Sequence, residues 1–71
     1  MDLPRVFGRN VRDARKAKGM SQEALAFEAE LMRSYISDLE RGQRNPSLKA
    51  IGKIADALGV EPWRLLKPSQ D

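Results

Sequence analysis

Basic side chains are the groups in this sequence best suited to bind a ligand, and they are concentrated in its first and last parts. Residues 1–20 contain six Lys and Arg against two acidic residues, and residues 41–71 contain six against three. Residues 21–40 have the opposite balance, with one basic and five acidic residues. Two basic flanks on either side of a central element are able to bind phosphate groups, although an ordinary solvated surface has the same composition. Charge alone therefore leaves both interpretations open.

The residue types that most catalytic and metal-binding sites need are missing. The sequence has no His and no Cys, which excludes Ser-His and Cys-His catalysis and zinc sites with imidazole or thiolate ligands. Paired catalytic groups are not evident either, so we expect no enzyme activity, no metal and no cofactor. The 71 residues suffice for one domain, residues 1–71, with a modest core and no disulfide, so we expect oligomerisation to add stability.

Five short helices and no strand are predicted from the 3.6-residue spacing of the apolar residues and from the Gly, Pro and Ser residues between them. The expected fold class is therefore all-α. The helices are expected at residues 4–18, 22–29, 33–41, 48–58 and 61–66. Ser21 and Ser47 are expected N-caps, and Gly19, Gly42 and Gly59 are expected to follow the ends of helices one, three and four.

The same spacing predicts which side chains form the core. Each of the first four helices has an inner face of apolar residues that recur every three or four positions. These residues are Val6, Phe7, Val11 and Ala14 in the first helix, Ala24, Leu25 and either Phe27 or Ala29 in the second, Ile36 and Leu39 in the third, and Leu48, Ile51, Ile54, Ala55 and Leu58 in the fourth.

The second and third helices are very close together in the sequence. Only Glu30, Leu31 and Met32 separate them. Two helices of about two turns each with so short a connection are what a helix-turn-helix requires, and residues 21–41 would form it. Helical hairpins without a role in DNA binding have the same pattern, so the spacing alone does not decide the function.

A resemblance to a known family covers nearly the whole chain. It is carried by residues 8–26 (GRNVRDARKAKGMSQEALA), 34–42 (SYISDLERG), 45–48 (NPSL) and 58–60 (LGV). In these segments the sequence resembles the Cro/C1-type helix-turn-helix transcription regulators, also called the XRE family. Residues 35–37 and 40–42 resemble in particular the short controller proteins of restriction-modification systems. The resemblance implies a five-helix, lambda-repressor-like DNA-binding domain.

The resemblance also implies that the third helix is the recognition helix, whose N-terminal residues enter the major groove while the second helix lies across the DNA backbone. The core-facing residues of this helix leave its other side chains pointing elsewhere: Arg33, Ser34, Ser37 and Asp38. We expect Arg33 to contact a base, because its guanidinium matches the O6 and N7 atoms of guanine. Ser34 and Tyr35 are expected to contact phosphates or base edges, although a plain surface or packing role fits each of them equally well.

Several positions match residues that support or extend the recognition helix in the family. Gln22 matches a glutamine that binds a phosphate and braces the first residue of that helix, here Arg33. Arg15 and Glu40 match a buried ion pair between the first helix and the end of the third, which orients the recognition helix. Three further candidates for phosphate contacts follow this helix, where each is otherwise a solvated side chain: Arg41, Arg44 and Asn45.

The turn between the second and third helices departs from the family pattern at two positions. Glu30 stands where the family usually has Gly, and Met32 stands where it usually has Ser or Thr. The turn therefore lacks the residue that best adopts a positive φ and the usual N-cap of the recognition helix. We expect a strained or reshaped turn, with an additional negative charge close to the DNA.

The C-terminal residues have more apolar surface than a short terminal helix needs. Trp63, Leu65 and Leu66 are therefore expected at a homodimer interface, and the resemblance supplies a precedent in a symmetric dimer formed through the fourth and fifth helices. The alternative is that Trp63 only closes the core of the monomer.

The sequence thus predicts a homodimer that binds a pseudo-palindromic operator in double-stranded DNA and regulates transcription. The alternative is an antitoxin-like or developmental regulator that acts chiefly by binding another protein. Residues 1–9 contain no uninterrupted apolar run, so we expect no signal peptide, no membrane span and a cytoplasmic location. We expect no small-molecule ligand either, because no second domain is left to hold one.

Overall fold

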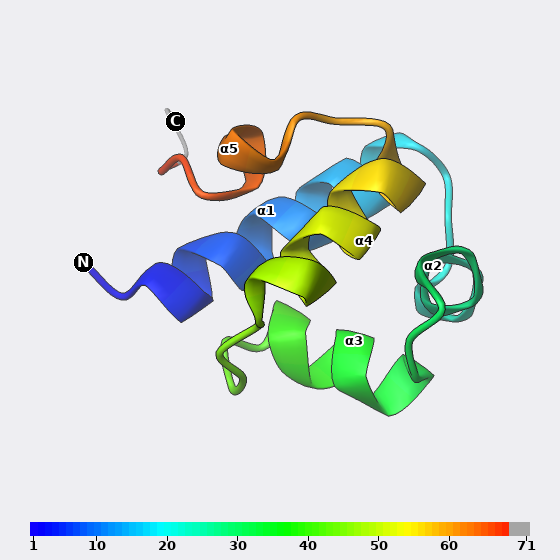
Figure 1. The fold of residues 1–71 in the computed structure, drawn as a ribbon, viewed down its shortest axis with the longest axis horizontal. Coiled ribbons are helices and arrows are strands. Elements are labelled where there is room, and N and C mark those ends of the chain that lie inside the picture. The colour runs from blue at the N-terminus through cyan, green and yellow to red at the C-terminus, as the bar shows by residue number, and fades with distance from the viewer. Residues whose placement is uncertain (69–71) are drawn as a thin grey trace.

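Short connections join five helices along the chain (Figure 1). The structure, a computed structural model, describes residues 1–68 and contains no strand in that range. The helices are α1 (Leu3–Ala17), α2 (Gln22–Ala29), α3 (Arg33–Glu40), α4 (Leu48–Leu58) and α5 (Pro62–Leu65). The all-α class and the five expected helices are confirmed, and their ends lie within one residue of the expected ones.

Side-chain caps and glycines fix most of the helix ends. The hydroxyl oxygen of Ser21 accepts a hydrogen bond from the amide of Ala24 at 3.0 Å, and Ser47 accepts one from Ala50 at the same distance. Both predicted N-caps are therefore confirmed. The three glycines expected beyond helix ends all have positive φ, at 73° for Gly19, 74° for Gly42 and 70° for Gly59, a conformation that costs glycine little.

The helices pack in an arrangement that leaves α3 along one edge of the molecule. Figure 1 shows α1 and α4 across the middle, α3 below them, α2 on the right, and α5 with the N-terminus on the left. α3 packs against α1 and α2, while α5 packs against α1 and α4. None of the helices within residues 1–68 is long and apolar enough to cross a membrane.

The close approach of α1 to α3 depends on Gly8. A Cβ atom at this position would overlap the carbonyl oxygen of Leu39 in α3. Because glycine has no Cβ, the backbones of the two helices are able to touch here. One turn further along α1, Val11 is completely buried. The contact therefore fixes the position of α3 on the rest of the domain.

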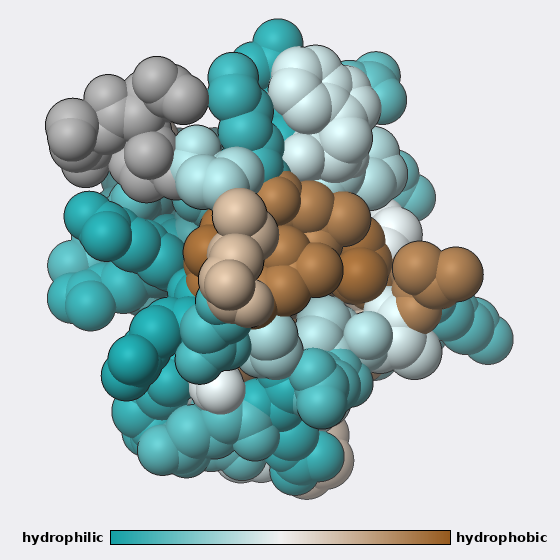
Figure 2. Space-filling model, turned by 90° about the vertical axis from the view of Figure 1, so that its left-hand side faces the viewer, coloured by the Kyte–Doolittle hydropathy of each residue, from teal (hydrophilic) through white to brown (hydrophobic). Residues whose placement is uncertain are grey.

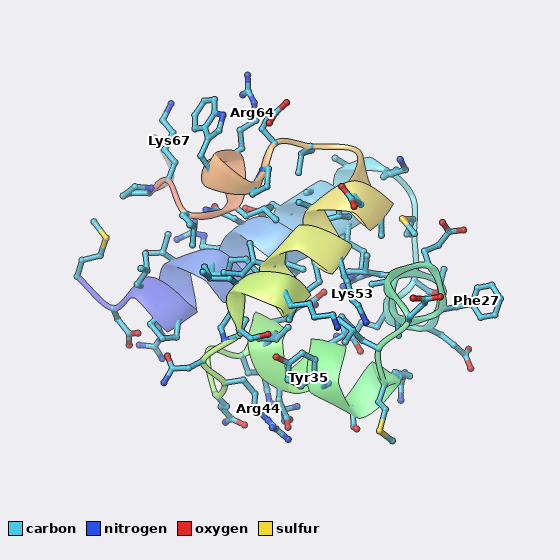
Figure 3. All side chains as sticks on the ribbon, in the orientation of Figure 1. Phe27, Tyr35, Arg44, Lys53, Arg64 and Lys67 are labelled. Atoms are coloured by element: carbon cyan, nitrogen blue, oxygen red, sulfur yellow. The ribbon has the colours of Figure 1, made fainter. Side chains whose placement is uncertain are left out.

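The predicted inner faces are mostly correct, but Val6 and Ala24 are only half-buried and lie outside the core cluster, and two further residues are exposed. Leu48 is 86% exposed and Phe27 is 83% exposed, so neither belongs to the core. Leu48 is the first residue of α4, where no preceding turn covers it, and Ala50 is buried in its place. In α2 the buried residues are Leu25, Ala26 and Ala29, which leaves Phe27 about 200° around the helix from both Leu25 and Ala29. Figure 3 shows its ring pointing away from the domain.

Candidate nucleic-acid interface

α3 has one face in the core and one face in solvent. Ile36 and Leu39 are completely buried. Successive residues of a helix are rotated by about 100°, so the side chains of the opposite face are those that point away from Ile36 and Leu39. They are Arg33, Ser34, Ser37, Asp38 and Arg41, of which Ser37 and Asp38 are half-buried and the other three are exposed.

The turn before α3 keeps a left-handed residue although no glycine is present. Glu30 has φ 58° and ψ 43°, and it is the only residue other than glycine with a positive φ in the described range. The next amide, that of Leu31, donates to the carbonyl of Ala26 at 2.9 Å. Met32 occupies the N-cap position of α3 with an extended backbone and no side-chain cap. The turn is therefore strained at Glu30, as expected, but it retains the geometry that a glycine would give.

A buried polar cluster joins α1, the start of α2 and the end of α3. Arg15 donates to Glu40 through Nε at 2.7 Å and through Nη2 at 3.0 Å, with side chains 10% and 4% exposed. The remaining guanidinium nitrogen donates to the carbonyl of Met20 at 2.9 Å. The hydrogen bond to Glu40 raises the pKa of Arg15 despite its burial, which acts in the opposite direction. The ion pair expected from the resemblance is present, and it joins α1 to the end of α3.

Gln22 belongs to the same cluster, which corrects one expectation. Its side-chain amide donates to Glu40 at 3.0 Å, so it braces the last residue of α3 and not Arg33, the first. Gln22 is the first residue of α2, and Glu40 lies near this helix start because Arg15 draws it inwards. No buried side-chain nitrogen or oxygen within residues 1–68 is left without a hydrogen bond.

A second polar cluster lies on the outer side of α3 around Asp38, and Figure 3 shows two of the residues beside it, Tyr35 and Arg44. Arg41 donates to Asp38 at 2.7 Å and to the hydroxyl of Ser37 at 3.1 Å. The Nε atom of Arg44 lies 3.5 Å from the other oxygen of Asp38. The guanidinium of Arg44 also lies over the ring of Tyr35, 5.3 Å from its centroid. Four of the expected DNA contacts are thus gathered around one carboxylate, whose part in the site was not foreseen from the sequence.

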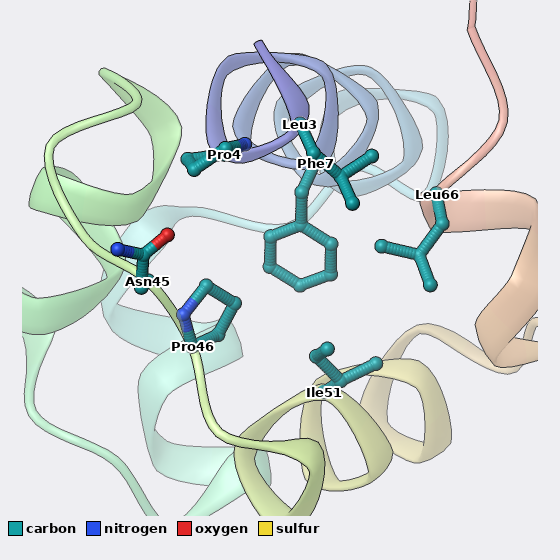
Figure 4. Close-up of a pocket in the computed structure, with 7 residues that line it drawn as sticks. All are labelled: Leu3, Pro4, Phe7, Asn45, Pro46, Ile51 and Leu66. Atoms are coloured by element: carbon teal, nitrogen blue, oxygen red, sulfur yellow. The ribbon is translucent and has the colours of Figure 1, made fainter. Parts of the chain in front are cut away.

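Arg33 and Asn45 lie apart from this cluster. The Arg33 side chain is exposed at the start of α3 and forms no hydrogen bond or ion pair with any residue in the described part of the chain. Its neighbour Ser34 is exposed as well. Asn45 instead lines an apolar hollow beside Leu3 and Pro46 (Figure 4). Arg33 is therefore available to a ligand at the N-terminal end of α3.

Cationic side chains lie on both flanks of the outer face of α3. On the flank of Glu40, an open hollow of ≈ 320 Å³ lies between α1, α2 and α3. Its lining residues are Arg12, Arg15, Lys16, Gln22, Ser37, Glu40 and Arg41. Tyr35 is five positions from Glu40 and therefore lies on the other flank, where Arg44 covers it. An anionic ligand that holds α3 in a groove would therefore contact cationic side chains on both sides of this helix.

The left-hand face of Figure 1, where α5 and the N-terminus lie, is apolar at its centre (Figure 2). A hollow of ≈ 130 Å³ lies there between α1, α4 and α5 (Figure 4). It is lined by Leu3, Pro4, Phe7, Asn45, Pro46, Ile51 and Leu66. This volume is smaller than the roughly 300–1,000 Å³ of typical small-molecule sites.

The residues expected at a dimer interface differ in exposure. Leu65 is only 2% exposed, because it is part of the core of its own domain. Leu66 is half-buried at the edge of the hollow, and Trp63 is 54% exposed with the Arg64 guanidinium 4.8 Å from its ring centroid. Leu65 is thus not available to a second chain, whereas Leu66 and Trp63 are.

Comparisons with known proteins identify the class to which this arrangement belongs. The helix-turn-helix family model matches residues 11–62, which include all of α2, α3 and α4. The chain therefore belongs to the helix-turn-helix family of Cro/C1-type transcription regulators, and the resemblance found in the sequence is confirmed.

Within this family the chain is similar to controller proteins of restriction-modification systems. It is 60% identical to the control protein C.BamHI of Bacillus amyloliquefaciens over 62 residues, which are 86% of this chain and 76% of that protein. The crystal structure of the controller protein C.AhdI from Aeromonas hydrophila is 53% identical, with a TM-score of 0.85 over 87% of this chain and 94% of that one. A hypothetical transcription factor from Neisseria is 46% identical, with a TM-score of 0.93 over 97% of this chain and 78% of that one.

Proposed function

We propose that this protein is a sequence-specific regulator that binds a pseudo-palindromic operator as a homodimer, with the N-terminal half of α3 in the major groove. The observation that carries the proposal is the outer face of α3, which presents Arg33, without an ion-pair partner among residues 1–68, between two cationic flanks. Sequence-specific DNA binding needs both kinds of contact: here Arg33 would contact a base, and the cationic side chains on either side would bind phosphates.

The flanks suit the two sugar-phosphate strands that border a major groove. Arg12 and Lys16 project from α1 beside Gln22, at the start of α2. The start of a helix favours anions because its first amide groups have no partner within the helix. On the other flank Arg44 lies in the loop after α3. We therefore propose phosphate contacts for Gln22, Arg41 and Arg44, whose positions on the two flanks of α3 suit this role. Asn45 lies closer to the apolar face.

The apolar face supports the proposed dimer. A two-fold partner packed against the left-hand face of Figure 1 would carry its own α3 along the same lower edge. The domain is 29 Å along its longest axis, which is comparable with the roughly 34 Å between successive major grooves on one side of a duplex. Leu3, Leu66 and Trp63 would lie in or beside such an interface, and Leu65 would support it from inside the domain.

Selection of binding sequences from a random duplex library tests the proposal. We expect an enriched site with two inverted half-sites whose centres are about 10 base pairs apart, or a multiple of one helical turn. The affinity for the selected site should fall steeply with salt, since each neutralised phosphate contributes about −0.9 to the slope of log K against log salt. An enriched sequence without symmetry, or no enrichment, would contradict the proposed mode of binding.

One observation favours the alternative of a regulator that acts through another protein. Phe27 is 83% exposed on α2 and has the acidic residues Glu23 and Glu28 on the same helix. Such a surface repels DNA and would suit a protein instead. Weak binding to DNA without any sequence preference would favour this alternative. For a regulator that acts on DNA we further propose a cytoplasmic location.

A further inference from the structure

Asp38 stands in an unexpected place for a surface that binds a polyanion. Its carboxylate lies on the outer face of α3, close to the middle of the proposed interface, with a side chain that is 29% exposed. A carboxylate in this position repels phosphates. Its two nearest charged partners, Arg41 and Arg44, are themselves candidates for phosphate contacts, so the same group both repels DNA and occupies the cations that attract it.

The contacts of Asp38 use both of its oxygens. One oxygen accepts a hydrogen bond from Arg41 at 2.7 Å, and the other lies 3.5 Å from Nε of Arg44. Ser37 and the Tyr35 ring hold the same two guanidinium groups from other directions. The Asp38 backbone takes part as well, since its carbonyl accepts from the amide of Gln43 at 3.0 Å. Both arginines therefore have defined positions before any DNA is bound.

These contacts have different consequences for random and for specific DNA. A random duplex offers mainly phosphates, so it must compete with Asp38 for Arg41 and Arg44 and receives no base contacts in exchange. An operator adds base contacts such as that of Arg33, and it also profits from arginines that are already oriented. The paired carboxylate thus weakens binding to random DNA more than binding to the operator.

We propose that Asp38 is a specificity-determining residue, which lowers the affinity for non-operator DNA by holding Arg41 and Arg44 in ion pairs that phosphates have to displace. This inference rests on the proposed DNA-binding function. It differs from direct recognition of a base by Asp38, for example at the N4 amino group of cytosine, which the experiment distinguishes.

The test compares Asp38→Asn with Asp56→Asn in titrations of a random duplex and of the selected operator. Both variants change the net charge by one unit, but Asp56 is exposed on α4, where it lies beside Glu61 and Arg64 and not beside α3. Release of two exposed ion pairs should raise the affinity of Asp38→Asn for the random duplex by about threefold to tenfold. Its salt slope should become steeper by about one unit, and its preference for the operator should fall. Asp56→Asn should change each of these values much less.

A double-mutant cycle establishes whether Asp38 acts through the two arginines. In a background with Arg41→Gln and Arg44→Gln, the substitution Asp38→Asn should no longer raise the affinity for the random duplex. An equal increase in both backgrounds, or equal effects of Asp38→Asn and Asp56→Asn, would overturn the proposal, because either result means that only bulk charge matters. A loss of operator affinity with unchanged random binding would overturn it in favour of a base contact.

The outcomes also separate this inference from the proposed function. If the unmodified protein binds neither duplex, the DNA-binding function itself fails. If it binds the operator with the expected symmetry and salt dependence while Asp38→Asn behaves as Asp56→Asn does, only the role of Asp38 fails. Circular dichroism of each variant verifies that the fold is retained, which we expect because neither carboxylate is part of the core.

Discussion

The three arginines at the outer face of α3 differ more in their partners than in their exposure. Arg33, Arg41 and Arg44 are all exposed, yet Arg41 and Arg44 are paired with Asp38. Arg33 has no such partner in the described part of the chain. The guanidinium of Arg33, in the first turn of α3, has all its N–H donors available for a base edge. The guanidinium groups of Arg41 and Arg44 have to leave the carboxylate of Asp38 before they bind a phosphate. The chemical roles of the three arginines should therefore differ.

Replacing Arg33 by Ala should reduce specificity before it reduces general affinity. The loss of one bidentate guanine contact should cost about 1–3 kcal/mol on the operator and much less on random DNA, which is bound through phosphates. Arg44→Ala is the matched comparison, because it should weaken binding to both duplexes, and not to the operator alone, and reduce the salt slope by about one unit. Titrations at two salt concentrations measure both effects. An equal loss on both duplexes for Arg33→Ala would mean that Arg33 binds only the backbone.

Met32 leaves the start of α3 less stable than a capping residue would. It occupies the N-cap of α3 without capping it and is 73% exposed, so its replacement removes little packing. Met32→Ser should therefore raise the free energy of unfolding by about 1 kcal/mol, the usual contribution of a serine cap. Urea denaturation measures this change. Ser21→Ala at the capped start of α2 should lower the same quantity by a similar amount, and an unchanged midpoint for Met32→Ser would show that the cap does not form.

The helices themselves were predictable because their signals are local. Ser21, Ser47 and Gly59 mark helix ends through groups within one turn, so their roles follow from neighbouring residues alone. The exposure of Phe27 and Leu48 was not predictable in this way. It depends on which other helix covers each position, and that information lies in the packing of distant segments.

The candidate site also combines features that follow from neighbouring residues with features that depend on distant segments. Arg15 and Glu40 are 25 positions apart, and only the family resemblance placed them together. The link between Gln22 and Glu40 was missed, because the resemblance pointed to Arg33 instead. The contacts of Asp38 span three and six positions, and such spacing at the end of a helix is a signal that sequence analysis could have used. The burial of Leu65 was missed because a short apolar helix looks the same whether it faces its own core or a partner.

At the scale of helices, the ion pair of Arg15 and Glu40 positions α3 relative to α1 and α2. Removing one partner leaves a buried charge without compensation, which typically costs about 3–5 kcal/mol. A domain of this size has a free energy of unfolding of only about 5–15 kcal/mol. Arg15→Ala should therefore lower the thermal midpoint strongly, as followed by circular dichroism. Arg12→Ala, an exposed position on the same helix, should leave the midpoint nearly unchanged. A loss below about 1 kcal/mol in Arg15→Ala would show that the pair adds little to the fold.

At the scale of the whole molecule, the proposed function uses two surfaces on different sides of the domain. Figure 1 places the outer face of α3 along the lower edge and the N-terminus with α5 on the left, and Figure 2 shows that this left-hand face is apolar at its centre. A two-fold axis through the apolar face would direct both copies of α3 towards one duplex. The small core of one domain gives a second reason for association, since two domains of this length bury more apolar surface together than apart.

Substitutions on the apolar face should therefore separate the two protomers without unfolding them. Leu3 is 44% exposed at the first position of α1, where a glutamate also suits the helix dipole. Because more than half of Leu3 is already buried in its own domain, Leu3→Glu should remove only about 0.7–1.3 kcal/mol of apolar burial per protomer, and the two protomers together should weaken dimerisation by about 10- to 80-fold. Sedimentation at micromolar concentration measures this.

Phe27→Glu is the matched control, because it places the same charge at a large exposed apolar residue on the far side of the molecule (Figure 3). It should leave the dimer intact. Leu3→Glu should also lose operator affinity, since a monomer contacts only one half-site, while its affinity for a single half-site should remain. If the unmodified protein sediments as a monomer, or if only Phe27→Glu dissociates it, the interface lies elsewhere. The operator would then be bound by two domains that meet only on the DNA.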